Sequence, residues 1–121
     1  MAHILIIDDD LQLLDMLRQT LEREGYDVVV ASNGKVGIKI YREDPVDLII
    51  TAMIMPEKEG IETIMELKKD FPDVKIIAIS GGGRSKPESH LNLAKQLGAK
   101  RVFPKPIDRE ELLNAVRELL G

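Results

Sequence analysis

The chain has 121 residues, which fits one domain with its own buried core. Its formal net charge is −4 and its pI is about 5.2, which argues against a surface built for nucleic acid or an anionic membrane. The sequence contains no cysteine, so disulfides, thiolate zinc sites and cysteine nucleophiles are excluded. The N-terminus lacks a signal-peptide pattern and no apolar run is long enough to span a membrane, so we expect a soluble, cytoplasmic protein.

Apolar runs alternate with stretches of helical spacing along the whole chain. The runs are rich in Ile and Val and nearly continuous, and they cover residues 3–7, 26–31, 46–51, 74–79 and, more weakly, 100–103. Continuous runs of this kind are typical of parallel strands that are covered on both faces. They therefore predict five buried strands.

The stretches between and after the runs predict helices over residues 10–24, 33–43, 57–70, 86–97 and 109–120. The first has leucines at helical spacing, at positions 11, 14, 17 and 21, and Gly25 follows as a stop. The second carries Val36 and Ile40 on one face, and Asp108 is placed to cap the last. Strict alternation of strand and helix predicts one α/β domain over residues 1–121, with a parallel sheet between two helical layers.

Polar side chains follow the strands, at the edge where ligands bind in open α/β sheets. Asp8 and Asp9 follow the first run, Ser80 follows the fourth, and Lys105 stands between two prolines after the fifth. Acids also favour helix N-termini, which explains Asp10 as an N-cap but explains the first two poorly. Adjacent carboxylates repel unless a cation lies between them, and Mg²⁺ commonly takes one or two carboxylates together with phosphate oxygens. The hydroxyl and the ammonium group are suited to holding such oxygens.

These residues belong to a set of motifs that resembles the receiver domain of two-component response regulators. The segments are ILIIDDD, the MP of AMIMPEKEG, ISGGG, LGAKR and FPKPID, and they are in register over the whole chain. The resemblance implies a (βα)5 flavodoxin-like sheet of order 2-1-3-4-5. It implies a signalling module rather than an enzyme, without an output domain in these residues.

The resemblance also implies a role for each residue of the site. Asp8, Asp9 and the backbone carbonyl of Ile54 match the ligands of Mg²⁺. Ser80 and Lys105 match the hydroxyl and the lysine that contact the phosphoryl group. The implied partners are a sensor histidine kinase or phosphotransfer protein and a downstream protein. A homodimer through the face of the fourth helix, fifth strand and fifth helix is a further implied assembly.

Ala52 stands where the family carries the aspartate that accepts the phosphoryl group. Alanine has no oxygen, so we expect no phosphorylation at this position and weaker binding of Mg²⁺. The other site residues are intact, which favours a deliberate Asp-to-Ala replacement. The alternatives are a natural pseudo-receiver that acts by protein binding alone, and a small nucleotide-binding α/β domain, although no glycine fingerprint follows the first strand. The aromatic residue expected three positions before the lysine is Val102 here, with Phe103 next to it.

Overall fold

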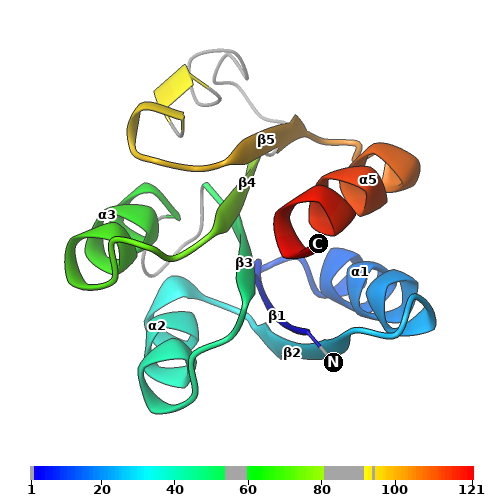
Figure 1. Cartoon of the computed structure of the whole chain (residues 1–121), viewed down its shortest axis with the longest axis horizontal. Helices are drawn as coiled ribbons and strands as arrows, with labels where there is room; N and C mark the ends of the chain where they lie inside the picture. Colours follow the sequence, from blue (N-terminus) through cyan, green and yellow to red (C-terminus); the bar gives the residue numbers. More distant parts are fainter. Residues whose placement is uncertain (1, 54–59, 81–91, 94) are drawn as a thin grey trace.

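Five parallel strands form a single sheet in the order β2-β1-β3-β4-β5 in the computed structural model, which describes residues 2–53, 60–80, 92–93 and 95–121 (Figure 1). The strands are β1 (His3–Ile7), β2 (Asp27–Ala31), β3 (Leu48–Ala52), β4 (Ile76–Ser80) and β5 (Arg101–Pro104). The order and the parallel pairing confirm the flavodoxin-like fold.

Helices cover both faces of the sheet, as alternation of strand and helix requires (Figure 1). One layer consists of α1 (Leu11–Arg23) and α5 (Arg109–Leu120), and the other contains α2 (Gly34–Glu43) and α3 (Gly60–Asp70). Most of the helix predicted over residues 86–97 lies outside the described residues, although 92–93 and 95–96 are helical.

The core consists of two apolar clusters separated by the sheet, because successive strand side chains point to opposite faces. Ile4 and Ile6 of β1 pack with the buried leucines of α1 and α5. Leu5 and Ile7 pack on the side of α2 and α3. The near-continuous apolar run of β1 thus fills both clusters, as expected for a central strand.

Capping residues define the ends of the helices where the sequence predicts them. The Asp10 side chain accepts a hydrogen bond from the backbone N–H of Leu13 at 3.1 Å. Asp108 accepts from the N–H of Glu111 at 3.1 Å in the same way. Gly25 follows α1 with φ of +93°, a conformation that favours glycine.

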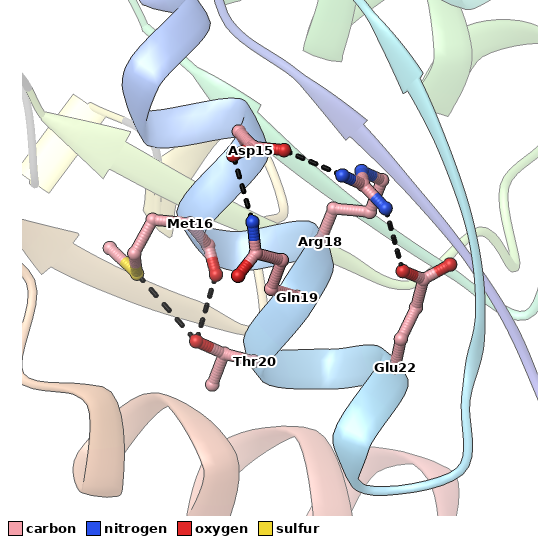
Figure 2. Close-up of polar contacts among 6 residues, drawn as sticks. All are labelled: Asp15, Met16, Arg18, Gln19, Thr20 and Glu22. Carbon is pink, nitrogen blue, oxygen red and sulfur yellow. Dashed lines mark hydrogen bonds and ion pairs between the residues drawn. The ribbon is translucent and has the colours of Figure 1, made fainter.

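Polar side chains of α1 form a network of contacts along the helix (Figure 2). Arg18 donates to Asp15 at 2.5 Å and to Glu22 at 2.8 Å, at spacings of three and four residues. Gln19 donates to the second oxygen of Asp15 at 2.9 Å. Pairs at these spacings stabilise a helix by about 0.2–0.5 kcal/mol each, so they mainly define the polar side of α1.

Burial differs from the sequence prediction at several positions. Leu11, the first residue of α1, is 69% exposed, and Val36, in the first turn of α2, is 43% exposed. The prediction that all strands are covered on both faces is wrong for both edge strands: Val29 and Val30 of β2 are each 37% exposed, and no residue of β5 is fully buried. The sheet order explains this difference, because β2 and β5 lie at its edges.

Candidate functional site

The predicted site residues follow neighbouring strands, and the sheet register brings them to its carboxyl edge. Ile7 pairs with Thr51, so the next residues along each strand, Asp8 and Ala52, lie side by side. On the far side of β3, Ala52 pairs with Ile79. The chain after β5 continues along this edge, since the Lys105 N–H donates to the Ser80 carbonyl at 3.0 Å.

Asp8 is the buried acid of this edge, with no solvent exposure. One carboxylate oxygen accepts from the Asp10 N–H at 3.0 Å, and the other lies 3.3 Å from the Lys105 ammonium. Burial raises the pKa of the Asp8 carboxyl above its ordinary value, while the Asp10 N–H and then the Lys105 charge oppose that shift. The adjacent Asp9 carboxyl adds a smaller upward contribution to the same pKa. Asp8 is therefore held by one backbone donor and one cation.

Two buried oxygens at this edge lack a hydrogen-bond partner among the described residues. They are Asp8 Oδ2 and the hydroxyl oxygen of Ser80, which is 1% exposed. The Lys105 ammonium lies 3.3 Å from the first of these oxygens and forms an ion pair with it. Buried polar atoms normally have partners, so unpartnered ones mark places suited to a ligand or an ion.

The donor set is compatible with Mg²⁺. Asp8 offers a buried oxygen and the exposed Asp9 lies next to it, and Mg²⁺ commonly binds through one or two carboxylates and retains several waters. No group of three or more acidic or histidine side chains able to hold a metal occurs among the residues that the structure describes. Ile54, whose carbonyl the sequence adds to this set, lies outside the described residues. The protein ligands that can be described are therefore few.

Ala52 lies in the centre of this edge and is almost completely buried, with 3% exposure. Its side chain is a methyl group that joins the apolar cluster on the side of α2 and α3. The Thr51 hydroxyl is buried and donates to the Ala52 carbonyl at 3.1 Å, so its proton is already used in this hydrogen bond. No nucleophilic oxygen is therefore present on the Ala52 side chain itself.

Gly60 contributes to this edge, and sequence reasoning did not single it out. A Cβ atom added to Gly60 would lie 1.6 Å from the Ala52 carbonyl oxygen and 2.5 Å from the Met53 Cα. The first residue of α3 thus packs directly on the backbone at the end of β3, a close approach that requires glycine. The only signal in the sequence was a glycine just before the apolar pattern of this helix.

Val102, at the position where an aromatic residue was expected, and its neighbour Phe103 point to opposite faces of the sheet. Val102 packs against the cluster on the side of α2 and α3, and Phe103 packs against the cluster of α1 and α5. Phe103 is thus part of the core packing.

In the parts of the chain that the structure describes, no helix has the length and apolar character needed to cross a membrane.

Comparison with known proteins places this chain among receivers. The model of the response regulator receiver domain family matches residues 4–117. Transcriptional regulatory protein CpxR from Klebsiella pneumoniae is 34% identical over 99% of this chain, and response regulator SaeR from Staphylococcus aureus is 31% identical over 99%. The chain spans about half the length of these two relatives, 50% and 51% respectively.

Solved structures give the same result. A response regulator receiver domain protein from Clostridium thermocellum is 31% identical, with a TM-score of 0.90 over 98% of this chain and 94% of that one. A CheY-like receiver domain protein from Methanospirillum hungatei is 29% identical, with a TM-score of 0.87 over 98% of this chain and 92% of that one. The sheet order, the match over residues 4–117 and these relatives together show that the chain belongs to the response regulator receiver domain family.

Proposed function

We propose that this chain is a receiver module of two-component signalling that cannot accept a phosphoryl group at its acceptor position. The observation that carries the proposal is Ala52, a buried methyl group at the end of β3 beside Asp8. Phosphoryl transfer to a receiver needs an oxygen nucleophile at that point. The neighbouring hydroxyl of Thr51 donates to a backbone carbonyl, which supports the view that it does not replace the missing carboxylate.

The remaining residues keep the arrangement of a phosphoryl-binding site. We assign Asp8 and Asp9, with the carbonyl of Ile54, to Mg²⁺, whose charge would neutralise phosphoryl oxygens at this edge. The buried, unpartnered hydroxyl of Ser80 is assigned to donate to a phosphoryl oxygen. Lys105, whose side chain is 26% exposed and paired with Asp8, is assigned to offer its ammonium group to the same anion.

Loss of one carboxylate affects the metal as well as the chemistry. The described acids at the site are two, so we propose that Mg²⁺ binds more weakly here than it does after Ala52→Asp. A single changed residue in an otherwise intact site favours a deliberate Asp-to-Ala replacement over a natural pseudo-receiver. Reading codon 52 of the encoding gene distinguishes these two origins.

The proposed partners are a sensor histidine kinase or phosphotransfer protein and a downstream protein. We propose that the chain is a single receiver domain over residues 1–121. It would occupy the kinase without taking its phosphoryl group. The transcriptional roles in the names of the relatives belong to longer proteins, and for this chain they are a proposal that depends on sequence beyond the matched part.

The experiment is intact-mass analysis after incubation with acetyl phosphate and Mg²⁺. We expect no adduct on the chain as it stands and one phosphoryl adduct after Ala52→Asp. Ala52→Asn is the matched control, because it adds the same bulk without a nucleophilic carboxylate. A stable phosphoryl adduct on the Ala52 chain would refute the proposal.

A further inference from the structure

The β2 edge of the sheet lacks the features that usually prevent strands from pairing with other chains. Edge strands are commonly protected by proline, by charged residues or by a bulge. The opposite edge strand, β5, has such features, because it ends in Pro104 and its Arg101 is paired with Glu118 at 2.8 Å. By contrast, β2 has the sequence DVVVA, with its single charge at the first residue, and lies at the lower edge of the sheet in Figure 1.

Two residues of β2 direct their backbone N–H and C=O groups away from β1, where no other strand of the described sheet pairs with them. The Asp27 N–H donates to the Ala2 carbonyl at 3.0 Å, and the Ala31 carbonyl accepts from Asp8 at 3.1 Å. Parallel pairing alternates along a strand, so residues 27, 29 and 31 face β1. The N–H and C=O groups of Val28 and Val30 therefore point away from the sheet.

The side chains along this edge are apolar on both faces. Val29 lies on the side of α2, where it lines a cavity of about 150 Å³ with Val28 and Ile40. Val30 lies on the side of α1, and it is as exposed as Val29, at 37% each. Exposed valines beside free backbone groups are costly in water and are well suited to a neighbouring strand.

We propose that β2 pairs antiparallel with β2 of a second copy of this chain, about a two-fold axis at Val29. In this register Val28 of each copy forms a hydrogen-bonded pair with Val30 of the other, which satisfies all outward-facing groups of both residues. The two Val29 residues then face each other as a non-hydrogen-bonded pair, the arrangement in which side chains lie closest. Sheets that are otherwise parallel commonly carry an antiparallel edge strand.

The single charge of β2 favours an antiparallel over a parallel arrangement of the two copies. Antiparallel pairing places the amino end of one strand beside the carboxyl end of the other. In the register with Val29 on the axis, the exposed Asp27 carboxylate, which lies 3.7 Å from His3, comes opposite the uncharged Ala31 of the second copy. A parallel pair would instead place the two Asp27 carboxylates together, which is unfavourable. The two-fold contact uses the same surface of both copies, so the assembly closes as a dimer.

The experiment uses single-cysteine variants, since the chain has no cysteine of its own. Val29→Cys and Val30→Cys are matched because both residues have the same 37% exposure and lie next to each other. Across the proposed axis, Val29 lies opposite Val29 of the second copy, whereas Val30 lies opposite Val28. Disulfides need a Cα separation of about 4.4–6.8 Å, so only a cysteine at position 29 is placed to pair with the same position of the second copy. In a buffer with oxidised and reduced glutathione we expect Val29→Cys to form disulfide dimers about tenfold faster than Val30→Cys.

Equal rates for the two variants, faster cross-linking at position 30, or no dimer at either position would each overturn the proposal. A second measurement avoids cysteine altogether. In sedimentation velocity at increasing concentration, we expect the unmodified chain to show dimer, Val29→Lys to remain monomeric, and Met65→Lys, which adds the same charge at an exposed position of α3, to behave as the unmodified chain. A monomer at all concentrations for the unmodified chain would also refute the pairing. These results are independent of the phosphorylation test.

Discussion

Introducing a carboxylate with Ala52→Asp is expected to destabilise the metal-free protein. The position is 3% exposed and lies beside Asp8, which is fully buried. Neighbouring strands are about 4.8 Å apart, so two carboxylates there are separated by about 5 Å. At an effective dielectric of about 20, two like charges at that distance repel by about 3 kcal/mol.

The nearby lysine offsets only part of this repulsion. Lys105 already pairs with Asp8 at 3.3 Å, and one ammonium cannot neutralise two carboxylates. We therefore expect Ala52→Asp to lower the free energy of unfolding by about 2–3 kcal/mol without divalent cations. Mg²⁺ should restore this loss, since a ligand at 100 times its Kd stabilises the folded state by about 2.7 kcal/mol.

The assay is urea unfolding of both proteins in EDTA and again in excess Mg²⁺. Ala52→Asn, which adds similar bulk without charge, measures the steric part of the effect. Metal should stabilise Ala52→Asp much more than the other two proteins. The reasoning fails if Ala52→Asp in EDTA is as stable as the Ala52 chain, or if Mg²⁺ stabilises all three equally.

Further predictions concern the packing around the sheet. Gly60→Ala should destabilise by more than about 3 kcal/mol, because the new Cβ would meet the Ala52 backbone, which cannot move aside; a small change in urea unfolding would contradict this. Gly37→Ala should cost less than Gly60→Ala, because the new Cβ would meet the Ile7 side chain rather than backbone, and the helix gains about 1 kcal/mol from alanine. Burial raises the pKa of Tyr41, so its neutral form stabilises the fold below the ordinary tyrosine pKa of about 10, and this stability is lost as pH rises through the raised value. In absorbance titration, we expect part of the tyrosine signal to appear above the ordinary tyrosine range and Tyr41→Phe to remove that part; a high-pH part left unchanged in Tyr41→Phe would contradict the prediction.

Much of the candidate site follows from the order of elements alone. The carboxyl ends of parallel strands meet at one edge, so the residues after the first, third and fourth apolar runs had to lie near one another. Asp8, Ala52 and Ser80 are found there, all nearly or fully buried. Lys105 follows the fifth run and reaches the same edge, where it lies 3.3 Å from Asp8.

The sequence could not predict which groups would pair at that edge. Its apolar pattern gives the position of a residue along a strand but not the distance between two side chains on different strands. The ion pair of Asp8 with Lys105 and the unpartnered hydroxyl of Ser80 depend on rotamers and register. Gly60 was missed for a similar reason, since its close contact with Ala52 joins residues from two different elements.

Local periodicity and the chemistry of single side chains are enough to predict the alternation of strands and helices, the caps at Asp10 and Asp108, and the absence of a side-chain oxygen at Ala52. Which strands are covered depends on their place in the folded sheet. The runs of β1 and β2 are similarly apolar, yet β1 is buried and Val29 of β2 is 37% exposed. Only the sheet order distinguishes them, because a central strand has neighbours on both sides and an edge strand presents one row of backbone groups to solvent.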